Sequence, residues 1–197
     1  MTFNSYLRIY VVSYISEVII IVDKSGASSS SPKKKGTITD VTDEYLINAK
    51  PGVGKVENQF KTDANSTQKE LNSEKRHQNE IETAQWLRDE FGGDIKIMKE
   101  ILKSNNDNSS ADYLWNNKNL ELKNPTSKKT LDGHMRKLID QIADNPGGGI
   151  FDFSNSLEDI TDLITTLEYK IPKRAKYDLD IIIKNNNALV KVYRYKK

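Results

Sequence analysis

The sequence predicts an α/β domain with a mixed central β-sheet that is flanked by helices and follows a disordered N-terminal extension. Two observations predict this class. From about residue 78 onward, hydrophobic patterns follow in the order helix, strand, hairpin, helix, strand, helix, hairpin. The chain has 197 residues, of which 36% are hydrophobic and 29% charged. That length is enough for one domain with an extension.

Composition divides the chain into three parts. Residues 1–23 form an apolar leader of unknown role, for which the alternatives are a strand-like remnant of an upstream region, an aggregation-prone leader and a membrane anchor. Residues 24–69 form a linker or junction, because their first third is rich in Ser, Gly and Lys, although a short helix is expected at 43–49. Residues 70–197 form the folded domain, and no stable membrane association is expected for it.

The folded domain is predicted to begin with a helix. Apolar side chains recur at helical spacing from Gln78 to Phe91, and two glycines end the run. Residues 94–99 alternate between apolar and polar, as in a half-buried strand. A polar loop then leads into the segment from Ala111 to Pro125.

The later elements follow from helical periodicity, turn residues and short apolar runs. We expect an amphipathic helix at 131–143, a turn at Pro146–Gly149, a strand at 150–153, a helix at 156–167 capped by Ser156, and a closing hairpin of 177–183 and 188–195 around Asn185–Asn187.

The segment from Ala111 to Pro125 is typical of a β-hairpin with functional side chains. Asn116 and Asn117 lie between two short runs rich in Tyr, Trp and Leu, and Asn tolerates the positive φ angles of tight hairpin turns. If these two residues are the loop, Asp112 lies opposite Glu121. Carboxylates in that position repel each other, so the sequence predicts a compensating divalent cation.

Lys123 belongs to the same group of side chains. It lies two residues after Glu121 and therefore shares its face of the strand, while Leu120 and Leu122 point to the other side. An acid pair with a bound cation polarises a phosphodiester, and an adjacent lysine orients the attacking water. The alternative is a solvated hairpin face, because the same Glu-x-Lys spacing recurs at Glu168.

Asp112 followed by Glu121-Leu122-Lys123 resembles the D…(D/E)xK signature of the PD-(D/E)xK nuclease superfamily. The run from about residue 79 to 197 is similar to the C-terminal nuclease toxin domains of CdiA-type contact-dependent inhibition proteins and related polymorphic toxins. Ala111 departs from the proline of the signature. The resemblance implies a PD-(D/E)xK nuclease-like core.

The resemblance also implies a set of site residues. A glutamate of the first helix reaches the metal in this superfamily, and Glu80 is the best match, with Glu82 as the second choice. The implied metal ligands are Glu80, Asp112, Glu121 and the backbone carbonyl of Leu122, with Lys123 assisting the water. The implied cofactor is Mg²⁺ or Mn²⁺, with Zn²⁺ as a further option.

The resemblance favours tRNA as the substrate. It further implies a cognate immunity protein, and action in the cytoplasm of a target bacterial cell after delivery within a larger secreted protein. Two alternatives stay open, namely a DNA endonuclease of the same superfamily and a non-catalytic module of a phage or mobile-element protein.

Nucleic-acid contacts are harder to assign. The net charge is only +2, but residues 170–197 are strongly basic and either contact phosphates or protect a strand edge. The candidate contacts are Lys128, Lys129, Gln141, Lys173 and Arg174. A mechanism with paired histidines is disfavoured, because His77 precedes the predicted first helix and His134 is expected on a helix surface. With no cysteine in the chain, a cysteine nucleophile is excluded.

Overall fold

The computed structural model describes residues 36–60, 65–98 and 111–197, which belong to one compact unit, residues 34–197. The strands are β1 (Thr37–Asp40), β2 (Val56–Glu57), β3 (Ile95–Ile97), β4 (Tyr113–Trp115), β5 (Lys118–Lys123), β6 (Pro146–Asp152), β7 (Leu179–Asn185) and β8 (Ala188–Lys196). The helices are α1 (Thr42–Asn48), α2 (Gln68–Arg76), α3 (Gln78–Phe91), α4 (Lys128–Gln141) and α5 (Ile160–Arg174).

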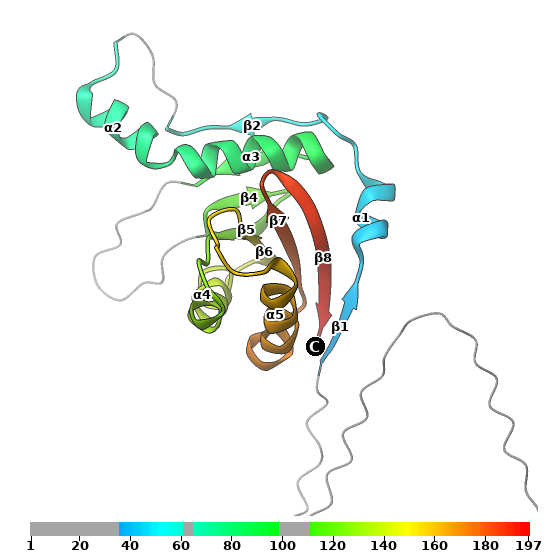
Figure 1. Cartoon of the computed structure of the whole chain (residues 1–197). Helices are drawn as coiled ribbons and strands as arrows, with labels where there is room; N and C mark the ends of the chain where they lie inside the picture. The colour runs from blue at the N-terminus through cyan, green and yellow to red at the C-terminus, as the bar shows by residue number, and fades with distance from the viewer. Residues whose placement is uncertain (1–35, 61–64, 99–110) are drawn as a thin grey trace, which may run out of the picture. The chain divides into compact units, whose positions relative to one another are not determined.

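The strands form one mixed sheet in the order β1-β8-β7-β6-β5-β4-β3-β2 (Figure 1). Strands β5, β6 and β7 are parallel, and they are joined through α4 and α5. Two crossovers of the same hand in one direction across a sheet place both helices on the same face. The expected α/β class, with a mixed sheet flanked by helices, is confirmed.

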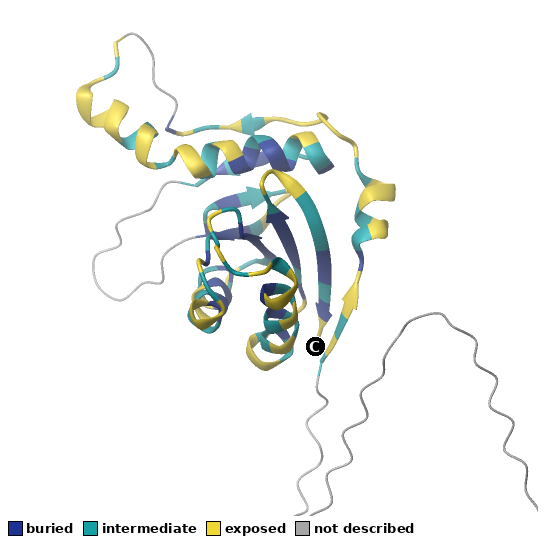
Figure 2. Cartoon of the chain, viewed as in Figure 1, coloured by how far each residue is buried: buried dark blue, intermediate teal, exposed yellow. Residues whose placement is uncertain are grey.

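Side chains that alternate along the central strands build a core on each face of the sheet. On one face Phe151, Ile181 and Tyr193 pack with apolar side chains of α4 and α5. On the other face Ile150 and Ile182 pack with α3. Figure 2 shows the buried central strands between these helices, whereas α2 has no buried residue. The sheet is therefore covered on both faces, as parallel strands require.

Both predicted asparagine turns are confirmed. Asn116 and Asn117 have φ angles of 47° and 62°, and Asn186 and Asn187 have 49° and 59°. These are left-handed conformations, which asparagine adopts at less cost than most residues. The register of the first hairpin is also as predicted, with Trp115 opposite Lys118, Leu114 opposite Asn119 and Tyr113 opposite Leu120.

The predicted linker at 24–69 differs from the structure in its second half. The short helix expected at 43–49 is present as α1, but the residues around it also join the sheet. β1 pairs antiparallel with β8, from Thr37 opposite Lys196 to Asp40 opposite Tyr193, and β2 pairs with β3. Strands this short carry no readable periodicity, and their stability comes from the neighbouring strand. The folded unit therefore begins well before residue 70.

The apolar leader at 1–23 lies outside the described residues, and so does most of the predicted polar loop before the hairpin. Within the part of the chain that is described, no helix is long and apolar enough to cross a membrane.

Two further predictions are corrected. Pro146–Gly149, expected as a turn, is the first half of β6. A Cβ added to Gly148 would lie 1.9 Å from the backbone oxygen of Asp180, so the close approach of β7 requires glycine here. The helix predicted at 156–167 begins only at Ile160, because Asp159 accepts the hydrogen bonds of the first turn, and it continues to Arg174.

Replacing Gly148 with alanine should destabilise the fold by about 1–3 kcal/mol, because backbone rather than a flexible side chain occupies the space that the new methyl group needs. Gly133→Ala in α4 is the matched control. An added Cβ there meets nothing within 4 Å, and alanine is the better helix former by roughly 0.5–1 kcal/mol. Urea unfolding of both variants should give free energies that change in opposite directions.

Candidate active site

Asp112 and Glu121 are held together by two crossed hydrogen bonds. The backbone N–H of Asp112 donates to Glu121 Oε2 at 3.0 Å, and the backbone N–H of Leu122 donates to Asp112 Oδ2 at 2.8 Å. Each carboxylate is thus oriented by the backbone of the opposite segment. The predicted juxtaposition of the two acids is present, and it is built into the hairpin.

Lys123 joins this pair from the same strand face. Its Nζ donates to Glu121 Oε1 and, at 2.6 Å, to Oε1 of Gln141, the last residue of α4. Glu121 and Lys123 are both buried. We call the group of Asp112, Glu121 and Lys123 the centre. Gln141, one of the predicted nucleic-acid contacts, instead binds Lys123 and holds it in position.

The electrostatics of the centre leave it short of positive charge. Burial and the neighbouring Asp112 carboxylate raise the pKa of Glu121 to about 8, although Lys123 and the Asp112 N–H act in the opposite direction. The ionised form of Glu121 is thus disfavoured near neutral pH even with an ammonium group in contact. A further cation would relieve this imbalance.

Tyr113 links the hairpin to the first helix. Its hydroxyl donates to the backbone oxygen of Glu80 at 3.0 Å. Burial and the nearby charges of Asp112, Glu80 and Glu121 hold the pKa of this tyrosine well above its ordinary value. All three predicted carboxylates therefore act electrostatically on this buried tyrosine.

The carboxylate of Glu80 nevertheless stands apart from the other two. It lies 4.0 Å from Nε2 of His77, and within the described ranges no group of three histidine or acidic side chains lies close enough to hold one metal ion. Glu82, the second choice, is exposed and accepts a hydrogen bond from Gln78.

Asp112 and Glu121 fit a divalent cation by their chemistry. They supply carboxylate oxygens, which Mg²⁺ and Mn²⁺ prefer, and burial together with the Asp112 carboxylate raises the pKa of Glu121, an effect that a bound cation would oppose. Leu122, whose carbonyl is the other predicted ligand, lies on β5 between Glu121 and Lys123.

His134 is a neighbour that sequence reasoning missed. Burial lowers its pKa, and so do the charges of Lys123 and Lys137, so the imidazole lies within electrostatic reach of the centre. It precedes Gln141 by seven residues, which is two helical turns and places both on one side of α4. That spacing from Gln141 was the available signal.

The other predicted nucleic-acid contacts lie on the surface of α4 and α5. Lys128 pairs with Asp162 at 2.7 Å, and Lys173 lies over the Tyr169 ring at 3.4 Å. Arg174 binds both oxygens of Asp132 at 2.9 Å, and Lys129 is exposed. Lys128 and Gln141 are at opposite ends of α4. Acidic side chains thus offset much of this basic charge, and only Gln141 contacts the centre.

A second buried ion pair lies on the other face of the sheet. Lys184 of β7 donates to Asp152 of β6 at 2.6 Å, and the two residues are directly paired in the ladder. Lys184 also lies over the Trp86 ring at 5.6 Å. Burial alone would raise the pKa of Asp152, but hydrogen bonds from Lys184 and Ser154 outweigh it and lower that pKa.

Comparisons with known proteins complete the description. No protein-family model and no curated protein matches the chain. Among solved structures, it is similar to a chain of the CdiA-CT/CdiI toxin and immunity complex from Burkholderia pseudomallei, with a TM-score of 0.45 and 12% identity. The match covers 71% of this chain and 97% of that chain.

Asp152→Asn should destabilise the fold by about 3 kcal/mol at pH 6, because it leaves the ammonium of Lys184 buried without a counter-charge. The pKa of Asp152 is lowered from its ordinary 3.8, so the carboxylate stabilises the fold above that value, and this contribution is lost as the pH falls through the folded-state pKa. The difference in unfolding free energy from the wild type should therefore shrink in acid. Asp178→Asn, at an exposed ion pair, should change little at either pH.

Proposed function

We propose that this domain is a metal-dependent nuclease that hydrolyses phosphodiester bonds. The observation that supports this proposal best is the buried group of Asp112, Glu121 and Lys123, in which two acids and an ammonium share one end of a hairpin. The same residues carry the resemblance to the PD-(D/E)xK superfamily. Two acids beside a lysine, one of the acids with a raised pKa, are more typical of a functional site than of a structural module.

Asp112 and Glu121 are the residues that would hold the cation, which is Mg²⁺ or Mn²⁺, or alternatively Zn²⁺. When bound, the cation supplies Lewis-acid polarisation of the phosphodiester and neutralises developing charge. Glu80 and the Leu122 carbonyl are the further ligands in this proposal. The hydroxyl of Tyr113 holds the backbone of Glu80 beside the hairpin, which keeps this helix end near the centre.

Lys123 is proposed to orient the attacking water and to stabilise negative charge as it develops. Its ammonium is held from two sides, by Glu121 and by Gln141, so it is positioned before substrate arrives. Gln141 is a positioning residue in this scheme, because it acts through the lysine.

The substrate we propose is tRNA, and this choice rests on the resemblance to CdiA-type toxin domains. The same resemblance is the basis for a cognate immunity protein and for action in the cytoplasm of a target bacterial cell. The alternative is a DNA endonuclease that uses the same residues, and cleavage of tRNA and of plasmid DNA distinguishes the two.

Asp112→Asn and Glu121→Gln should each reduce cleavage by about 100-fold or more, because each removes a ligand charge and leaves the shape of the side chain nearly unchanged. The measurement is cleavage of total tRNA and of plasmid DNA by the full chain in Mg²⁺, Mn²⁺, Zn²⁺ or EDTA. Asp178→Asn, in the link between α5 and β7 and at an exposed ion pair, is the matched control and should remain active. An active Asp112→Asn protein would refute the site, and cleavage of plasmid alone would reassign the substrate to DNA.

Lys123→Met should reduce turnover by roughly 10²–10⁴-fold while metal affinity changes little, because the lysine acts on the water. Lys129→Met at an exposed position of α4 is the control. Single-turnover kinetics gives the rate, and calorimetry gives the affinity for Mn²⁺. If calorimetry shows that metal binding is lost, the role assigned to Lys123 is incorrect.

A further inference from the structure

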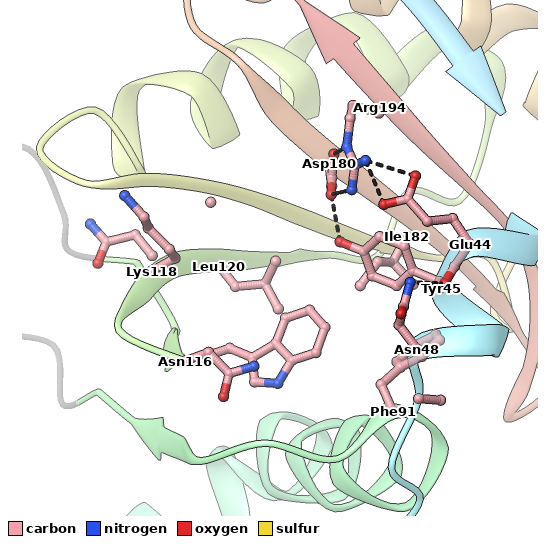
Figure 3. Close-up of a pocket in the computed structure, with 14 residues that line it drawn as sticks. Glu44, Tyr45, Asn48, Phe91, Asn116, Lys118, Leu120, Asp180, Ile182 and Arg194 are labelled. Carbon is pink, nitrogen blue, oxygen red and sulfur yellow. Dashed lines mark hydrogen bonds and ion pairs between the residues drawn. The ribbon is translucent and has the colours of Figure 1, made fainter. Parts of the chain in front are cut away.

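A pocket of about 350 Å³ opens on the face of the sheet opposite Glu121 and Lys123 (Figure 3). Leu120 lines it and belongs to the core on the α3 side, whereas the two catalytic candidates alternate to the α4 side of the same strand. The pocket is lined by residues of α1, the last residue of α3, the turn between β4 and β5, and residues of strands β5 to β8. It is thus separate from the catalytic centre.

Aromatic rings form one wall of this pocket. Tyr45 and Phe91 meet edge to face at 5.4 Å between ring centres, and Trp115 lies 6.1 Å from Phe91 and 6.3 Å from Tyr45. The indole N–H of Trp115 donates to the Gly92 oxygen at 2.9 Å, and the Tyr45 hydroxyl donates to Asp180 at 2.6 Å. Because their polar ends are already bonded, the rings are fixed in place and offer mainly their apolar surface to a ligand.

The charges that line the pocket compensate one another. Arg194 binds both oxygens of Asp180 at 2.9 Å and also pairs with Glu44 at 2.7 Å, as Figure 3 shows. Lys118 donates to the side chain of Asn145 at 3.2 Å. The pocket therefore contains two carboxylates against two cations, and it favours a neutral ligand over an anion.

Amide side chains supply the remaining polarity. Asn48, Asn116 and Asn119 line the pocket. The Asn48 nitrogen already donates to the Glu44 backbone oxygen at 2.8 Å and the Asn116 oxygen accepts from the Asp94 N–H at 3.2 Å, so these two amides offer a ligand mainly the Asn48 oxygen and the Asn116 nitrogen. A fixed aromatic wall beside several amides suits a flat neutral heterocycle that carries donors and acceptors along its edge. We propose that this pocket binds a nucleobase. The choice of a nucleobase among flat heterocycles rests on the proposed nuclease function.

The test uses the two tryptophans of the chain, Trp86 and Trp115, as reporters. The ¹⁵N-labelled full chain should give two indole signals, which Trp86→Phe assigns. Titration with adenosine, guanosine, cytidine and uridine should move the Trp115 signal in a saturable manner for at least one nucleoside, while the Trp86 signal stays in place. If neither nucleosides nor oligonucleotides move the Trp115 signal, the proposal is overturned.

Asn48→Leu provides an independent variant, because Asn48 is exposed at the end of α1 and its loss should not disturb the core. It removes one amide from the pocket and should weaken binding about fivefold, which is the value of one neutral hydrogen bond. Asn72→Leu, at an exposed position of α2, is the matched control and should bind as the wild type does. Equal affinity of both variants would exclude the pocket as the binding site.

Two titrations distinguish a base within a nucleic acid from a free nucleoside as the ligand of the pocket. A single-stranded oligonucleotide added to the Asp112→Asn chain moves the Trp115 signal if the pocket holds a base within a nucleic acid, whereas nucleosides alone move it if the ligand is a free metabolite. If the wild-type chain cleaves nucleic acid but no ligand moves the Trp115 signal, the proposal that the pocket binds a nucleobase is wrong and the nuclease proposal stands. A Trp115 shift in a chain that cleaves neither tRNA nor DNA contradicts only the proposed catalytic function.

Discussion

The crossed hydrogen bonds between Asp112 and the Glu121–Leu122 segment are the constraint on which the candidate active site depends. The Glu121 carboxylate accepts from the N–H of Asp112 and the Asp112 carboxylate accepts from the N–H of Leu122, so moving either acid away breaks a hydrogen bond to the opposite segment. A slip of one residue would turn Glu121 and Lys123 toward the α3 core and would expose two leucines to the polar side. The same register therefore determines both the packing of the sheet and the composition of the centre.

Small residues in β6 connect this centre to the rest of the fold. A Cβ on Gly149 would lie 2.0 Å from the Leu138 side chain, which shows how closely α4 approaches the sheet. Leu138 precedes Gln141 by three residues on the same helix, and Gln141 reaches Lys123. Because Gly149 of β6 has no side chain, α4 can lie close to the sheet. From that position Gln141 of α4 holds Lys123 of β5.

The features that the sequence predicted well are those set by local chemistry. Asparagine pairs with positive φ determine the two hairpins, and the alternation within β5 places Glu121 and Lys123 on one face. The joining of β1 and β2 to the sheet was missed because strands of two to four residues carry no periodic signal. The glycines of β6 resemble a turn until the neighbouring strand is known.

Contacts between distant elements account for the rest of the candidate site. The packing of the helices brings Gln141 to Lys123. It also pairs Lys128 with an acid on α5 and Arg174 with an acid on α4. The position of His134 near Lys123 depends on the same packing. Exposure of single lysines or histidines along a helix does not reveal such pairings, because every lysine on a polar face has the same local pattern.

The pairing of β1 with β8 has a consequence for how the chain folds as it is made. Thr37 lies opposite Lys196, so the first described strand finds its partner only after the whole segment between the two strands has been made. At translation rates of roughly 5–20 residues per second, the interval between the two is on the order of 10–30 s. During that time β1 must stay unpaired or be shielded, and this edge of the sheet closes only after β8 has been made.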